Sequence, residues 1–208
     1  MGRRVNAREL IFRFLRRGEA EMKRRIVKKK RRIVLLHKKI GKRSLDHNFS
    51  FKIRPIMGSE EGEVLRIIRS HDETDAHYAK RYYDEYFYSK ARSSDRVFVA
   101  VTPRNKVIGV SGYFHDTKEP KGIFWLAWTY VIPSYRHYGV GNAFIRVVEK
   151  ELRGRGARKL YLNTSSHNIY KGAVRFYLDR GFKWEGYLRD YYRKGEDQII
   201  LGKTIARR

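Results

Sequence analysis

One stretch of the sequence, residues 125–153, constrains the fold more than any other. It begins within an apolar run, Ile123 to Ile132, which is rich in aromatic and β-branched side chains and stops at Pro133, as is typical of a buried strand. From Ala143 to Leu152 apolar residues recur at helical spacing, and Gly154 and Gly156 follow as a stop signal. The stretch predicts a strand that turns directly into a helix packed on a sheet.

The turn between this strand and helix carries chemical information. Gly139 and Gly141 lack a Cβ, so the backbone there can approach a ligand closely. The first N–H groups of a helix have no partner within it, and the helix dipole places partial positive charge on them. Arg136 and His137 add side-chain donors. The turn therefore predicts a diphosphate site, although a Gly-x-Gly at such a place is also compatible with a tight connection and nothing more.

Two other phosphate-binding motifs are excluded. The sequence has no Gly-x-x-x-x-Gly-Lys-Ser/Thr, because its one Gly-Lys-Thr, at 202–204, has Asp197 in place of the first glycine, so it contains no P-loop. It also has no Gly-x-Gly-x-x-Gly followed by a βα unit and an acidic residue, which argues against a dinucleotide-binding fold.

Two motifs carry a family resemblance. The turn resembles the acetyl-CoA signature of the GNAT superfamily of N-acetyltransferases, Arg/Gln-x-x-Gly-x-Gly/Ala, in the pattern Val131-x-Pro133-x-Tyr135-Arg136-x-x-Gly139-x-Gly141. The segment 173–182, AVRFYLDRGF, resembles the second landmark of that family, Ala-x-x-x-Tyr-x-x-x-Gly-Phe. The two motifs lie in the family's order and at its spacing, and the resemblance covers the chain from about Phe49 to its C-terminus.

The resemblance implies roles for particular residues. It makes Tyr177 the general acid toward the leaving CoA thiolate, where the alternative is a tyrosine packed on the sheet with its hydroxyl in water. It places the oxyanion donor at the backbone N–H of Val131, where the family's central strand bulges. The family's CoA-contacting Asn corresponds to Tyr170 here, with Asn168 close by. The diphosphate would be held by the turn, that is by Arg136, His137, Tyr138, Gly139, Val140, Gly141 and Asn142.

No general base can be identified from the sequence. The closing segment 191–197 resembles that of ribosomal-protein N-terminal alanine acetyltransferases, which use a Glu on the strand before the second landmark. The corresponding position here is Ser165. Tyr130, His115 and Asn163 remain as weak candidates that would act through water, and the amine can also arrive already neutral.

The rest of the core sequence predicts a mixed α/β fold. Strands are expected at 49–56, 97–102, 107–114, 123–132, 159–164, 182–192 and 198–204, and helices beginning near Ser59, Ala76, Ala143 and Ala173. This order matches what the GNAT resemblance implies, a mixed sheet splayed near its middle, flanked by helices, with CoA in the gap. The helix at 76–91 is dense in tyrosine, which indicates either core packing or an aromatic wall for an amine.

Acidic residues are concentrated near this tyrosine-rich helix, although the protein is strongly basic. Asp72, Glu73, Asp75, Asp84 and Glu85 form a local reversal of charge. Two interpretations are open: the acids attract a cationic acceptor, or they only balance basic neighbours such as Lys80 and Arg81.

The first 48 residues differ from the predicted GNAT domain at 49–208. They hold 18 basic and 4 acidic residues, a net charge of +14 out of +26 for the whole chain, and their apolar residues show helical spacing. We expect a basic amphipathic helical extension. It would be a solvated arm, a segment that binds RNA or the ribosome, or one that lies on an anionic membrane surface.

Composition excludes several classes of protein. There is no cysteine, hence no disulfide, thiolate metal site or cysteine nucleophile, and the seven histidines form no metal-ligand cluster. No apolar run is long enough to span a bilayer, and the N-terminus lacks a signal-peptide core. We expect a cytoplasmic protein, either soluble or peripheral to ribosome or membrane.

Together these features predict an acetyl-CoA-dependent N-acetyltransferase that needs no metal and acts on a primary amine by direct transfer in a ternary complex. A protein N-terminus is one acceptor class. A small amine such as a polyamine, amino sugar or amino acid is another. The competing interpretation is a non-catalytic basic module that binds RNA or the ribosome through a GNAT-like fold.

Overall fold

The computed structural model describes residues 49–89, 92–115 and 118–205. All of them belong to one unit of the chain, Asn48–Arg208. The predicted basic extension at 1–48 lies outside the described residues, so its helices and its boundary stay predictions. Within the described part, no helix has the length and apolar character needed to cross a membrane.

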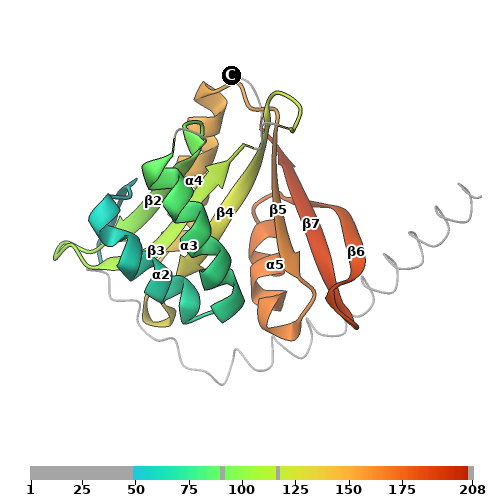
Figure 1. The fold of residues 1–208 in the computed structure, drawn as a ribbon, viewed down its shortest axis with the longest axis horizontal. Coiled ribbons are helices and arrows are strands. Elements are labelled where there is room, and N and C mark those ends of the chain that lie inside the picture. Colours follow the sequence, from blue (N-terminus) through green and yellow to red (C-terminus); the bar gives the residue numbers. More distant parts are fainter. Residues whose placement is uncertain (1–48, 90–91, 116–117, 206–208) are drawn as a thin grey trace, which may run out of the picture. The chain divides into compact units, whose positions relative to one another are not determined.

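In the part of the chain that the structure describes, seven strands form a single sheet in the order β1-β2-β3-β4-β5-β7-β6 (Figure 1). All neighbouring strands are antiparallel except β4 and β5, which are parallel. The strands are β1 Lys52–Pro55, β2 Arg96–Val101, β3 Val107–Phe114, β4 Ile123–Val131, β5 Lys159–Ser165, β6 Lys183–Arg193 and β7 Glu196–Thr204. The sequence predicted all seven, with ends displaced by one to three residues in most cases.

The sheet opens in its middle. β4 and β5 pair only at their first residues, from Ile123 opposite Lys159 to Trp125 opposite Tyr161. Beyond that point β4 continues to Val131 and β5 to Ser165 without pairing to each other, and Figure 1 shows the two strands moving apart. The predicted splayed sheet is therefore present, and backbone groups on the facing edges of both strands are left without a strand partner.

Among the described residues, four helices cover the two faces of the sheet: α2 Glu61–Arg69, α3 Glu73–Tyr88, α4 Val140–Gly154 and α5 Lys171–Leu178. Successive residues of β2 point to opposite faces, so Val97 and Val99 pack in one hydrophobic cluster with α2 and α3. Phe98 and Ala100 pack in the other cluster with α4 and α5. The helices thus pack on both faces of the sheet, and the ends of helices border the region where β4 and β5 diverge.

Two helix starts differ from the sequence prediction. α2 was expected to begin near Ser59, but Ser59 lies in a 3-10 turn, Gly58–Glu60, in which the Glu60 carboxylate accepts a bond from the Met57 N–H at 2.9 Å. The second helix was expected to begin near Ala76. Instead α3 begins at Glu73, because the Asp72 side chain caps it by accepting from the Asp75 N–H at 3.0 Å.

Candidate functional site

The turn between β4 and α4 leaves six successive N–H groups without a protein acceptor in the described part of the chain. The first bond of the helix runs from the Ala143 N–H to the Gly139 carbonyl at 3.0 Å. His137 and Gly139 both have left-handed backbones, with φ of 70° and 85°. Alternating conformations of this kind turn successive N–H groups to one side and form an anion-binding nest. The six unbonded groups are those of His137, Tyr138, Gly139, Val140, Gly141 and Asn142.

Aromatic packing holds this turn in place. The ring of Phe49, just before β1, lies 4.6 Å from that of Tyr138 and 5.5 Å from that of Tyr135. Lys106 from the β2–β3 connection also lies over the Tyr135 ring, at 5.4 Å. The left-handed backbone of His137, which costs about 1–2 kcal/mol in a residue with a Cβ, thus lies in the chain between two packed rings, those of Tyr135 and Tyr138.

The two glycines of the turn are required for different reasons. Gly139 needs its left-handed backbone, and a Cβ there would meet nothing within 4 Å. A Cβ on Gly141 would lie 3.0 Å from the Phe176 ring of α5. From the sequence we predicted that both glycines make room for a ligand. At Gly141 the absence of a Cβ instead makes room for the Phe176 ring.

Arg180 links the turn to the second motif. Its guanidinium stacks 3.5 Å above the Phe176 ring and donates to the Phe176 carbonyl at 2.6 Å. It also donates to the side-chain oxygen of Asn142 in the first turn of α4. Burial lowers the pKa of Arg180, against a smaller rise caused by Asp179. The two sequence motifs therefore form one physical unit.

The backbone N–H of Val131 faces the divergence of the strands. Val131 lies opposite Gly109 of β3, and the next residue, Ile132, donates to the Ile108 carbonyl at 3.0 Å. Hydrogen-bonded and non-bonded pairs alternate in an antiparallel ladder, so Val131 directs its N–H away from β3 and toward β5. The bulge expected at Val131 lies earlier in β4. There the segment from Ala127 to Tyr130 of β4 pairs with the segment from Gly112 to Val110 of β3, which is one residue shorter.

Arg136 is directed toward the connection between α2 and α3. It donates to the Val131 carbonyl at 3.2 Å and to the ring of His71 at 2.9 Å. The His71 ring stacks on Tyr130 at 4.8 Å, and burial together with the charge of Arg136 lowers its pKa. Asn168, the other predicted CoA contact, is exposed in the 3-10 turn that precedes α5.

The Tyr177 side chain is buried, with 8% of its surface exposed. Its ring packs edge-on against Phe182 at 5.4 Å. Burial raises the pKa of Tyr177 to about 12, and the neighbouring Thr129 hydroxyl and the charge of Arg180 oppose that rise. Thr129 belongs to the bulge of β4 and lies 2.8 Å from the Ser111 hydroxyl. The Tyr177 hydroxyl thus lies beside the central strand, and the sequence alone gave no sign of the part played by Thr129.

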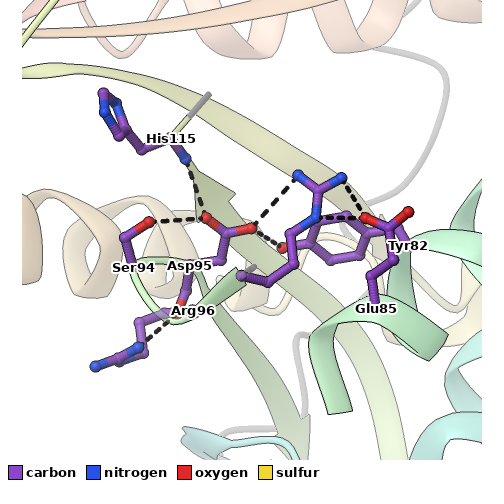
Figure 2. A network of polar contacts seen from close by, with 7 residues as sticks. Tyr82, Glu85, Ser94, Asp95, Arg96 and His115 are labelled. Atoms are coloured by element: carbon purple, nitrogen blue, oxygen red, sulfur yellow. Dashed lines mark hydrogen bonds and ion pairs between the residues drawn. The ribbon is translucent and has the colours of Figure 1, made fainter. Parts of the chain in front are cut away.

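Two of the candidate bases lie elsewhere. The His115 ring contacts the Ile123 carbonyl at 2.8 Å. The backbone N–H of His115 donates to the Asp95 carboxylate at 3.1 Å (Figure 2). Ile123 is the first residue of β4, at the opposite end from Val131. Asp95 is fully buried and accepts from the Tyr82 hydroxyl at 3.0 Å, so this network anchors α3 to the sheet. Asn163 is exposed on β5.

At Ser165, where the resemblance led us to expect a Glu, the structure supplies a carboxylate from the neighbouring strand. The buried Ser165 hydroxyl donates to Glu196 of β7. Glu196 also accepts from Arg193 at 2.6 Å, and these bonds lower its pKa, that from Ser165 most. A carboxylate bound in this way is a weak base.

The acidic residues at 72–85 separate into two groups, and only one of them balances basic neighbours among the described residues. Asp72 and Asp75 form no ion pair with a described residue and accept instead from tyrosine hydroxyls, Asp72 from Tyr170 at 2.5 Å and Asp75 from Tyr130. The other three form ion pairs with basic neighbours: Glu73 with Arg69, Asp84 with Lys80 and Glu85 with Arg92.

Two of the α3 tyrosines are packing residues: Tyr82 and Tyr83 are 6% and 1% exposed, whereas Tyr78 and Tyr88 are 61% and 80% exposed. The tyrosines near the unpaired acids come from other elements: Tyr130 from β4, Tyr170 from the turn before α5, and Tyr192 from β6, which Asp75 influences electrostatically. Sequence reasoning did not place Tyr170 and Tyr192 beside these acids, and the only signal was that Tyr170 replaces an expected Asn.

Comparison with known proteins decides the family. Residues 63–182, more than half of the chain, match the model of the Acetyltransferase (GNAT) family. The chain belongs to the GNAT family. GNAT acetyltransferases use acetyl-CoA, and the described residues of this member include no group of three or more side chains suited to hold a metal ion.

Solved GNAT structures resemble this one. A putative GNAT acetyltransferase from Desulfovibrio desulfuricans is 27% identical, with a TM-score of 0.69 over 76% of this chain and 100% of that one. Two further structures share the fold. One is an aminoglycoside 6'-N-acetyltransferase complexed with coenzyme A, which is 18% identical, with a TM-score of 0.60 over 76% of this chain and 98% of that one. The other is a ribosomal-protein-alanine N-acetyltransferase from Brucella melitensis, which is 19% identical, with a TM-score of 0.60 over 74% of this chain and 99% of that one. A search of curated proteins found no significant match.

Proposed function

We propose that this GNAT acetyltransferase transfers the acetyl group of acetyl-CoA directly to the α-amine of a peptide N-terminus, with both substrates bound together. One observation carries the proposal: six unbonded N–H groups, from His137 to Asn142, lie where the central strand of an opened sheet meets its helix. Such a nest fits a diphosphate without rearrangement of the backbone.

The chain supplies the groups that thioester aminolysis requires. The N–H groups of the nest and the dipole of α4 would hold the diphosphate, which fixes the thioester along the unpaired edge of β4. The Val131 N–H points from that edge and would donate to the oxygen on which negative charge develops. Tyr177 would protonate the leaving thiolate, because a phenol with a pKa of about 12 keeps its proton at neutral pH.

The charge of the acceptor side supports an amine that arrives as a cation. Asp72 and Asp75 lie without basic partners among the described residues of a protein whose net charge is +26. An ammonium group would be attracted electrostatically by both carboxylates, and this attraction acts over several ångströms. The likeness of the closing segment 191–197 to ribosomal-protein alanine acetyltransferases favours a peptide N-terminus.

A small polyamine is the second candidate. The observation that favours it is the same pair of unpaired acids, because two carboxylates suit a ligand with more than one positive charge. A peptide would instead present one ammonium group and place its chain over the exposed aromatic strand β6.

The release of CoA thiol by the full-length protein tests the proposal. The chain has no cysteine, so a thiol reagent reports CoA without a protein background. The acceptors would be a hexapeptide with a free N-terminal alanine, the same peptide with its N-terminus blocked, spermidine and an amino sugar. We expect turnover with the free peptide and none with the blocked one. Turnover with spermidine alone would establish the second candidate, and no turnover with any amine would contradict both.

A further inference from the structure

We propose that Tyr130 takes the proton from the acceptor amine while passing its own proton to Asp75, so that this pair replaces the base absent from Ser165. The inference rests on the proposed acetyltransferase function and adds to it a catalytic residue, Tyr130, and a positioning residue, Asp75.

The position of Tyr130 carries the proposal. Tyr130 directly precedes Val131 on β4, the strand whose unpaired edge would lie along the thioester. Its hydroxyl donates to Oδ2 of Asp75, 55 positions earlier in the chain, in the first turn of α3. The pair therefore bridges the central strand and the acid-bearing helix, between the predicted donor side and the predicted acceptor side.

Asp75 differs from the other carboxylates near these strands. Glu196 is bound to Arg193 and Ser165, and Asp72 accepts from Tyr170 and from backbone N–H groups, so both have lowered pKa values. Asp75 is more deeply buried and bonds only to a neutral phenol through its side chain. Burial raises its pKa, and the bond from Tyr130 opposes that rise in part. It is the best proton acceptor of the three.

Several groups surround the pair. From the α2–α3 connection these are His71, stacked on Tyr130, and Asp72; from the turn after β4, Arg136; and from η4 and β6, Tyr170 and Tyr192. Burial and the two aspartates raise the pKa of Tyr130, so its hydroxyl is protonated at rest. Burial and the charge of Arg136 lower the pKa of His71, and its ring nitrogens face the Arg136 guanidinium.

The protons balance in two steps. In the first, the ammonium group gives a proton to the Tyr130 oxygen as the Tyr130 proton moves to Asp75, which leaves a neutral amine and a neutral Asp75. In the second, the amine nitrogen bonds to the acetyl carbon, the carbon–sulfur bond breaks, and the thiolate takes the Tyr177 proton. The second proton of the nitrogen restores Tyr177, and Asp75 returns its proton to water.

The test is the pH dependence of kcat/KM of the full-length protein between pH 6 and 10, with the N-terminal alanine peptide as the probe. Without the relay only the neutral amine reacts, and an α-amine has a pKa of about 8. For Tyr130→Phe we therefore expect a loss of about 100-fold at pH 6, about 10-fold at pH 7 and less than about 2-fold at pH 9.

Asp75→Asn provides a second variant that keeps an acceptor for the Tyr130 hydroxyl but cannot take up a proton. The same pH-dependent loss is expected. The matched control is Tyr170→Phe, which removes the hydroxyl of the other tyrosine–aspartate pair, and there the loss should be small and equal at every pH. CoA affinity and the thermal midpoint, measured for all variants, separate loss of the relay from loss of the fold.

A loss in Tyr130→Phe that is the same at all pH values, or an unchanged rate, would overturn the inference. So would an Asp75→Asn variant with the wild-type profile. If the wild-type protein acetylates no amine, the proposed function fails, which is a different result from a wild-type enzyme whose Tyr130→Phe variant keeps its pH profile.

Discussion

The glycines of the β4–α4 turn and of α4 have different roles, which depend on their positions. Gly139 supplies a left-handed backbone, Gly141 supplies space for a neighbouring ring, and Gly154, at the end of α4, has neither constraint. The same chemical change, addition of one methyl group, therefore has three different physical consequences in one helix.

Alanine substitutions measure this difference. Gly139→Ala should lower the free energy of unfolding by about 1–2 kcal/mol through backbone strain, and Gly141→Ala by about 1–3 kcal/mol through overpacking against Phe176. Gly154→Ala, the matched control, should be neutral or slightly stabilising. Adding Phe176→Leu should relieve the cost at Gly141 but not at Gly139. If the double variant shows no relief, the account of Gly141 is wrong.

Tyr177 allows two residue-level tests. If it is the acid, Tyr177→Phe lowers kcat by at least about 10-fold, with acetyl-CoA affinity nearly unchanged. A rate equal to that of the wild type would remove Tyr177 from the mechanism.

The raised pKa of Tyr177 also affects stability in alkali. The folded protein holds this proton to about pH 12, whereas an unfolded tyrosine releases it near pH 10. Its contribution is therefore fully present below pH 10 and is lost as the pH rises toward 12, a change of up to ~3 kcal/mol. Denaturant titrations from pH 8 to 12 give the free energies of unfolding of wild type and Tyr177→Phe. The wild-type value should fall by this amount relative to that of the variant, and an unchanged difference between them would contradict the assigned environment.

At the scale of elements, α4 and α5 depend on each other through Arg180. Its stack on Phe176 and its bonds to Phe176 and Asn142 join the two helices next to the nest. Arg180→Ala should weaken CoA binding and lower the free energy of unfolding by about 1–3 kcal/mol. Arg175→Ala on the same helix is the control, because its exposed 3.5 Å ion pair with Asp179 contributes less than about 1 kcal/mol. Equal effects of the two changes on CoA affinity would refute the coupling.

Local patterns predicted the elements of this fold well. The strands and helices follow apolar periodicity, and the nest follows from glycines beside a helix start. What the sequence did not reveal depends on long-range pairing. Tyr170 and Asp72 are 98 positions apart, and the bulge at Thr129 exists only in register with β3. Neither the Tyr170–Asp72 contact nor the bulge has a local sequence signature, so the predicted acceptor side could be recognised only in the folded structure.

At the scale of the whole molecule, the charge distribution predicts an electrostatic partner. The segment 1–48 carries +14 of the net +26. If it binds RNA through phosphates, the affinity of the full-length protein should fall steeply between 50 and 200 mM salt and be lost on deletion of 1–48. If it lies on membranes, the same should hold for anionic vesicles. Binding to neither at low salt would leave the solvated arm as the remaining interpretation.

The most direct test of the central claim is a crystal structure of the full-length protein with coenzyme A. The account predicts the diphosphate oxygens within about 2.7–3.2 Å of several N–H groups between His137 and Asn142, with the sulfur near Tyr177. A diphosphate bound elsewhere, with those N–H groups bonded to water or to protein, would contradict it.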